Sequence, residues 1–226
     1  MKIVAPKPEE VLRYLGVAAP DAETLRLVDE SIALLCEQAE ARFVHRLFEI
    51  TVQKGSVQLL DRVMISESLS SHMAGCAHAV LFAMTLGASV DRLIARYAQT
   101  NIAMAAGLQA AAAAAVEAAC DDFCSDLATQ AQSGALTGFS GYLTARFSPG
   151  YGDFPLHYQK DVLELLNAPI RIGLTTTESF MLAPSKSVTA FVGVSPVPVK
   201  SCYGECALCG KHDCAFRRNI PSTGVN

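Results

Sequence analysis

The residues best suited to binding a small ligand lie in a short, turn-rich segment that reads RFSPGY over residues 146–151. Its composition predicts a type II turn, because Pro149 fixes φ at the second turn position and Gly150 supplies the positive φ of the third. Such a turn leaves backbone N–H and C=O groups free between Arg146 and Tyr151. A guanidinium matches a carboxylate, and an aromatic ring can cover an adenine or a cation. The segment is therefore a candidate binding site, although an ordinary surface turn with a solvated arginine has the same composition.

A second candidate is a carboxylate inside a long apolar segment. Glu117 closely follows six consecutive alanines at residues 110–115, within a helix predicted over residues 101–132. The alanines remove side-chain bulk, so another backbone can approach this helix closely. A carboxylate in a buried helix must be paired, face a cavity or bind something, because an unpaired buried charge is costly.

The C-terminal end carries a third candidate, a cluster of thiols. Cys202, Cys206, Cys209 and Cys214 have the spacing C-x3-C-x2-C-x4-C. In a reducing compartment this spacing indicates a metal site. It predicts either a structural zinc site or an iron–sulfur cluster, and a thiol-based redox or disulfide function is the third interpretation.

The remaining cysteines and the histidines give weaker signals. Cys36, Cys76, Cys120 and Cys124 fall on apolar faces, where small buried hydrophobic roles are expected. The histidines show no H-x-x-x-H spacing, and the sequence has neither a G-x-S-x-G elbow nor a Ser-His-Asp order. It also has no G-x-G-x-x-G or P-loop motif. Hydrolysis by acyl transfer and the usual modes of nucleotide binding therefore lack support, and we name no catalytic residue.

Composition limits the class of protein. The 226 residues, 51% of them hydrophobic, suffice for one large domain or two small ones and exclude global disorder. The formal net charge is −4, and Lys and Arg form no run before Arg217 and Arg218. A nucleic-acid partner is therefore not expected.

The sequence also predicts where the protein works. The first ten residues have no apolar core and soon turn acidic, so they do not resemble a signal peptide. The most membrane-like stretch, residues 102–120, is mostly alanine and is interrupted by Gln109 and Glu117. We therefore expect a packed helix, no membrane and a cytoplasmic location.

The elements that must position these candidates form an α+β pattern. Helices are predicted over residues 9–15, from a cap at Asp21 onward, and over 68–74, 89–97, 101–132 and 155–166, the last stopped by Pro169. Strands are predicted over residues 43–52, 77–86, 172–174, 180–182 and 187–194. We expect helices packed on a small, mainly antiparallel twisted sheet, in a single domain over residues 1–199 followed by a cysteine-rich tail over 200–226.

The binding segment and the residues after it resemble a known family. Residues 146–151, Pro155, His157, the run TESF at 177–180, Pro184 and the pair SV at 187–188 resemble the C-terminal activation domain of cobalamin-dependent methionine synthase. Order and gaps match over residues 146–194, and weaker similarity reaches back to about residue 75. The resemblance implies a domain that binds S-adenosylmethionine. It further implies that the domain supplies the methyl group when oxidised cobalamin is reductively remethylated, with flavodoxin or ferredoxin as the electron donor.

The resemblance also implies roles for particular residues. Arg146 and Tyr151 match the family's ligand-binding motif, Pro149 and Gly150 form its turn, and Glu117 matches a helix glutamate near the ligand. The family uses a further acidic residue near the start of the domain, for which this sequence offers no single counterpart. With no methyltransferase or cobalamin module attached, the chain is expected to act on a partner cobalamin-dependent methyltransferase, as an accessory to its activity.

Two other functions remain open from the sequence. The first is a redox or electron-transfer protein that acts through the tail cysteines, and the second is a helical scaffold with a zinc-stapled tail. The first three tail cysteines also have the spacing of radical S-adenosylmethionine enzymes, but the predicted elements lack the strand–helix alternation of their barrel.

Overall fold

The structure is a computed structural model that describes residues 3–199. The helices of this part are α1 Pro8–Leu15, α2 Ala22–Gln38, α3 Glu67–His72, α4 Ala88–Thr100, α5 Ile102–Gln132, α6 Tyr158–Leu166 and α7 Ala168–Ile172. Its strands are β1 Arg42–Glu49, β2 Thr51–Gln53, β3 Ser56–Leu59, β4 Arg62–Ile65, β5 His78–Thr85, β6 Tyr142–Leu143, β7 Thr175–Thr176, β8 Leu182–Ala183 and β9 Ser187–Ser195.

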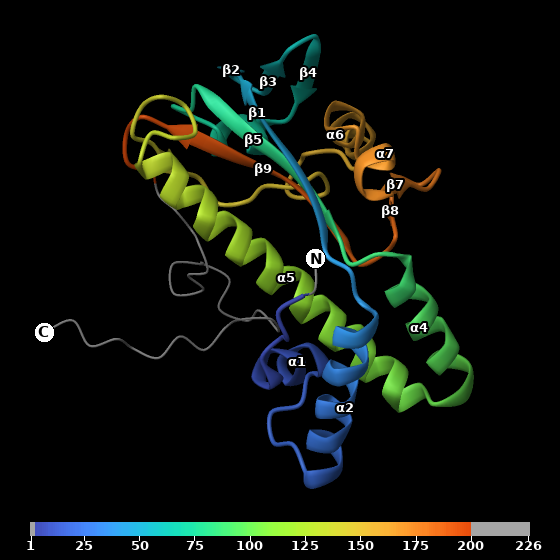
Figure 1. Cartoon of the computed structure of the whole chain (residues 1–226). Helices are drawn as coiled ribbons and strands as arrows, with labels where there is room; N and C mark the ends of the chain where they lie inside the picture. Colours follow the sequence, from blue (N-terminus) through green and yellow to red (C-terminus); the bar gives the residue numbers. More distant parts are fainter. Residues whose placement is uncertain (1–2, 200–226) are drawn as a thin grey trace, which may run out of the picture.

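A four-stranded antiparallel sheet, in the order β1-β5-β9-β6, forms the centre of the fold (Figure 1). Strand β5 is buried on both of its faces. Phe82 and Met84 pack into the core that the sheet shares with α5. Leu81 and Ala83 point the other way, into a second core with α6 and α7. Burial on both faces explains why this strand reads as a continuous apolar run instead of an alternating one.

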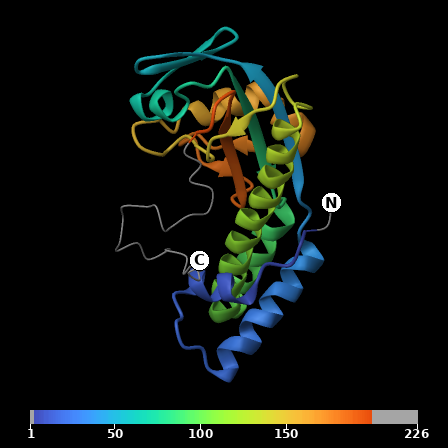
Figure 2. The ribbon, with the colours of Figure 1, turned by 90° about the vertical axis from the view of Figure 1, so that its left-hand side faces the viewer.

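Helix α5 runs along one face of the sheet and is the longest element of the described chain. Asn101 caps it by accepting a hydrogen bond from the backbone N–H of Met104 at 3.1 Å. A Cβ atom on Gly107 would lie 2.2 Å from Oγ of Ser31 in α2, so glycine allows the two helices to approach this closely. Helices α1, α2 and α4 gather around the N-terminal half of α5 (Figures 1 and 2).

By length and composition, α5 is also the one helix within residues 3–199 that could cross a membrane. Of its most apolar stretch, 56% is buried inside the protein. The sheet and the neighbouring helices cover its alanine-rich surface, so α5 serves here as a core helix, as the sequence predicts.

The opposite face of the sheet is covered by α6, α7 and a small three-stranded sheet in the order β2-β3-β4. Arg62 of β4 forms ion pairs with Asp161 and Glu164 of α6, the second at 3.0 Å. These contacts connect the small sheet to α6, one of the helices of the second core.

The predicted α+β class, with helices packed on an antiparallel sheet, is confirmed. The prediction of one strand over residues 43–52 is wrong, because the strand ends at Glu49 and the chain turns into the small β2-β3-β4 sheet, which was missed. The predicted strand over residues 172–174 is also wrong. Pro169 lies in the first turn of α7, which begins at Ala168, since proline is well tolerated in the first turn of a helix. The strand predicted over 180–182 begins only at Leu182.

Candidate functional site

The candidate binding segment is attached to the edge of the main sheet. Thr144 donates its backbone N–H to the carbonyl of Gly193 at 3.0 Å. Three residues further on, Phe147 and Phe191 exchange two backbone hydrogen bonds of 2.9 and 2.8 Å. Arg146 lies between these two attachment points, so β9 fixes the backbone from which its side chain extends.

The turn predicted from the sequence is present. The backbone N–H of Tyr151 donates to the carbonyl of Ser148 at 3.2 Å, which closes a four-residue turn. Gly150 has a φ of +98°, a backbone conformation that residues other than glycine rarely adopt. Its N–H donates to the carbonyl of Phe154 at 2.8 Å, so the turn is folded back on the residues that follow it.

Asp153 ties this turn to the N-terminus of α3. Its carboxylate accepts hydrogen bonds from Oγ of Ser66 at 2.6 Å and from the backbone N–H groups of Glu67 and Ser68 at 2.8 and 2.9 Å. These hydrogen bonds hold the pKa of Asp153 well below its usual value, with the Ser66 hydroxyl contributing most. The turn is thus anchored to a second element as well as to β9.

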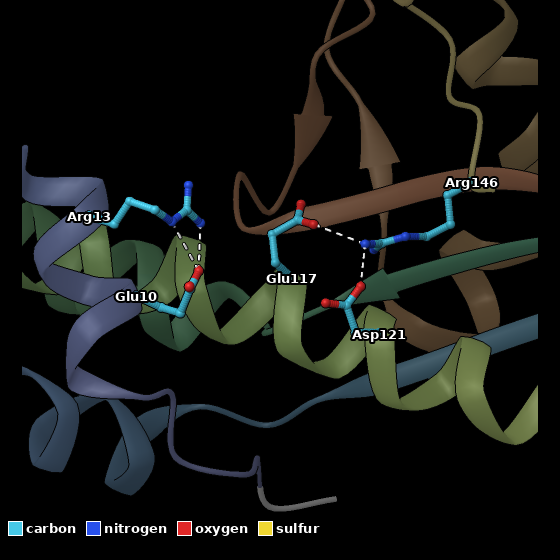
Figure 3. A network of polar contacts seen from close by, with 5 residues as sticks. All are labelled: Glu10, Arg13, Glu117, Asp121 and Arg146. Atoms are coloured by element: carbon cyan, nitrogen blue, oxygen red, sulfur yellow. Dashed lines mark hydrogen bonds and ion pairs between the residues drawn. The ribbon is translucent and has the colours of Figure 1, made fainter. Parts of the chain in front are cut away.

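Arg146 extends toward α5, where two carboxylates meet it (Figure 3). Its Nη2 lies 3.1 Å from Oε2 of Glu117 and 2.6 Å from Oδ1 of Asp121. The side chain of Arg146 is 20% exposed, and those of Glu117 and Asp121 are 37% and 36% exposed. Burial disfavours the charged form of Arg146, yet its attraction to the carboxylates of Glu117 and Asp121 outweighs burial and raises its pKa. The guanidinium therefore stays charged.

A pocket of about 460 Å³ opens between this ion-pair network, the turn and the end of the main sheet. All five residues predicted to bind a ligand line it: Glu117, Arg146, Pro149, Gly150 and Tyr151. Its volume falls within the range of small-molecule sites, about 300–1,000 Å³. The structure thus brings the five candidates together, and their contact with a ligand remains a prediction.

Other segments complete the walls of the pocket. Leu182 comes from β8, and Val188 and Thr189 come from β9. Gln159 of α6 accepts a hydrogen bond from the hydroxyl of Thr189, which joins two of the pocket walls. The ring of Tyr151 is 61% exposed and lies edge-on to that of Phe147, with centroids 6.2 Å apart, so it stands at the rim of the pocket.

Two features differ from the expectation from sequence. Arg146 was expected to offer its guanidinium to a ligand, whereas in the structure it is already paired with acids of α5. Asp121 was not among the predicted residues. Its position four residues after Glu117 puts both on one face of the helix, and that spacing was the available signal.

The thiols of α5 lie close to this network without forming a metal site. Cys120 and Cys124 are buried, and burial raises the pKa of each thiol to about 12. Both are therefore neutral thiols at physiological pH. Within residues 3–199 no group of His, Cys, Asp and Glu could hold a metal ion. The predicted tail ligands Cys202, Cys206, Cys209 and Cys214 lie outside the described residues.

A larger pocket of about 620 Å³ lies at the C-terminal end of β1, where Arg46, Glu49 and His78 are among its lining residues. The Nδ1 atom of His78 is buried and lacks a hydrogen-bond partner in the described part of the chain. None of the candidate ligand-binding residues lies there, so size alone does not select the functional site.

The comparisons with known proteins concern the family and the fold of the chain. The family model described as "Vitamin B12 dependent methionine synthase, activation domain" matches residues 25–215. A search of curated proteins found no match. Among solved structures, "Crystal Structure of the MetH Reactivation Domain bound to AdoHcy" is similar, with a TM-score of 0.60 and 17% sequence identity. The alignment covers 88% of this chain and 80% of that chain, and it shows a shared fold.

Proposed function

Because the chain belongs to the family of vitamin B12-dependent methionine synthase activation domains, we propose that it binds S-adenosylmethionine in the pocket beside Arg146. It would supply this methyl donor for the reductive remethylation of cobalamin on a partner methyltransferase.

The observation that carries the proposal is the convergence of the predicted residues from two distant segments on one pocket. S-Adenosylmethionine presents a carboxylate, an ammonium group, a sulfonium, a ribose and an adenine. The pocket offers the guanidinium of Arg146 for the carboxylate and the carboxylate of Glu117 for the ammonium group or ribose hydroxyls. The turn backbone and the ring of Tyr151 are available to the adenine. The similar solved domain holds AdoHcy, which has the same amino-acid and adenosine groups.

The chemistry required of this chain is positioning. Bound S-adenosylmethionine would supply an electrophilic methyl group, and the reduced cobalamin of the partner would be the acceptor. The pocket residues would bind the donor, fix its orientation and exclude water, which lowers the barrier without a protein acid or base. The protein would thus be an accessory to methyltransferase activity.

The remaining components belong to the same proposal. The partner would be methionine synthase or another cobalamin-dependent methyltransferase, and flavodoxin or ferredoxin would donate the electron. These reactions would take place in the cytoplasm. The tail cysteines would hold zinc or an iron–sulfur cluster, which metal analysis and a visible absorption spectrum of anaerobically purified protein would distinguish.

Calorimetric titration with S-adenosylmethionine tests the proposal. We expect the wild type to bind and Arg146→Ala to bind about 2–4 kcal/mol more weakly, the usual effect of removing one partner of a buried charged hydrogen bond. Arg42→Ala is the matched control, because Arg42 forms an exposed ion pair with Glu40 away from the pocket. Circular dichroism would show whether each variant is folded.

No binding by the folded wild type at millimolar ligand would overturn the proposal. If the ligand binds, titration against a cobalamin-loaded partner tests the second half. With reduced flavodoxin or ferredoxin present to supply the one electron that the reaction needs, the spectrum should change from that of cob(II)alamin to that of methylcobalamin.

A further inference from the structure

The carboxylates of Glu117 and Asp121 both contact Nη2 of Arg146, but only one of these two residues lines the pocket. Glu117 lines it, whereas Asp121 is not among the described residues that do. The contact of Nη2 with Asp121 is the shorter, at 2.6 Å against 3.1 Å for Glu117. Figure 3 shows the two carboxylates reaching the tip of the guanidinium from neighbouring turns of α5.

This difference matters when a ligand enters. A ligand carboxylate must approach Arg146, and the donors of the same ligand must approach Glu117, so the pair between these two residues has to loosen. The side chain of Arg146 is four-fifths covered, and a buried charge that loses its partner is strongly destabilised. Asp121 can keep its contact with Arg146 throughout, because Asp121 is not one of the residues that line the pocket and need not turn toward the ligand.

The net charge of these three residues also gives Asp121 a role in ligand binding. Glu117, Asp121 and Arg146 together carry one more negative than positive charge. S-Adenosylmethionine carries one more positive than negative charge, from its sulfonium, ammonium and carboxylate groups. S-Adenosylhomocysteine, its thioether product, is neutral overall. A site with excess negative charge attracts the first more than the second.

We infer that Asp121 is a positioning and selectivity residue of this pocket, an inference that rests on the proposed function. Asp121 holds the Arg146 guanidinium at the pocket wall while Glu117 turns to the ligand. Its charge favours the sulfonium donor over the neutral thioether, so attraction weakens once the methyl group has left. The residue acts through Arg146 and the local field, without contact with the reacting atoms.

The test compares the affinities of S-adenosylmethionine and S-adenosylhomocysteine by calorimetry in four proteins: the wild type, Asp121→Asn, Asp121→Glu and Asp122→Asn. Asp122 is the matched control, since it is the next residue of α5, is exposed and undergoes the same change of charge. For Asp121→Asn we expect weaker binding of both ligands. We also expect the preference for the sulfonium to fall about 3- to 10-fold, the effect of one charge about 10 Å away at an effective dielectric constant of about 25–50. Asp121→Glu should recover most of this preference, and Asp122→Asn should keep it.

The outcomes separate the two levels of the argument. If the folded wild type binds neither ligand, the proposed function fails. If the wild type binds both and Asp121→Asn behaves like Asp122→Asn, the proposed function stands and the inference about Asp121 is overturned. An equal loss for both ligands in Asp121→Asn also overturns it, because Asp121 would then act only on structure.

Discussion

At the scale of single residues, the pocket depends on the positive φ of Gly150 and on the charge of Arg146. Gly150 holds a φ of +98° within the turn, and a Cβ atom there would also lie 3.3 Å from the side chain of Leu156. Arg146 extends from a backbone fixed by β9 on both sides. The two residues are close in sequence, but one supplies shape and the other supplies charge.

Replacing Gly150 with alanine separates these contributions. We expect Gly150→Ala to lose about 1–3 kcal/mol of unfolding free energy, because alanine is strained at this φ, and to bind S-adenosylmethionine more weakly. Urea denaturation and calorimetry measure the two effects. The control is Gly138→Ala, since Gly138 has a φ of +80° with open space around it and does not line the pocket. Weakened binding in both variants would show that general strain, and not the turn, controls affinity.

At the scale of elements, the pocket is the meeting point of α5, β9 and a turn that α3 holds in place. The N-terminus of α3 receives two side-chain acceptors. Oγ of Ser66 accepts a hydrogen bond from the backbone N–H of Leu69 at 3.0 Å. The carboxylate of Asp153 accepts hydrogen bonds from the backbone N–H groups of Glu67 and Ser68. A short helix is thus stabilised by the same carboxylate that fixes the loop.

This anchor predicts a pH dependence. The pKa of Asp153 is lowered in the folded protein, so its stabilisation is complete above the unfolded value of about 4 and is lost as the pH falls through the folded value. Asp153→Asn should therefore melt at a lower temperature than the wild type at neutral pH, and the difference should shrink below about pH 4. Melting curves followed by circular dichroism between about pH 2 and 7 measure this difference. A difference that stays constant with pH would contradict the assigned role of the charge.

At the scale of the whole molecule, one sheet buried on both faces organises the fold. The core with α5 and the core with α6 and α7 are both built from residues within 3–199. Strand β9, which lies between β5 and β6 in the sheet, ends at Ser195. Residues 3–199 therefore supply both hydrophobic cores, one on each face of the main sheet.

We accordingly expect truncation after Val199 to leave the fold intact. The shortened chain should keep its helical circular dichroism and a melting temperature close to that of the full chain. A collapse of the helical signal would show that residues 200–226 belong to the core. Because the family match continues to residue 215, the truncated protein should also be titrated with S-adenosylmethionine, which shows whether the removed part contributes to binding.

The sequence alone determined the features that depend on neighbouring residues. The turn at 148–151 follows from the φ preferences of Pro149 and Gly150, and α5 follows from a long run of helix-forming residues with a cap. The family was also identifiable from the motif and its downstream partners.

The tertiary structure decided the features that depend on contacts between distant segments. Arg146 meets Glu117 and Asp121 across 29 and 25 residues of chain, and no local pattern encodes that pairing. The small sheet over residues 51–65 was missed for a related reason, because strand pairing depends on partners and burial more than on intrinsic preference. Local conformational preferences thus specified the parts of the site, and only long-range packing specified that the arginine is shared between two acids at the wall of one pocket.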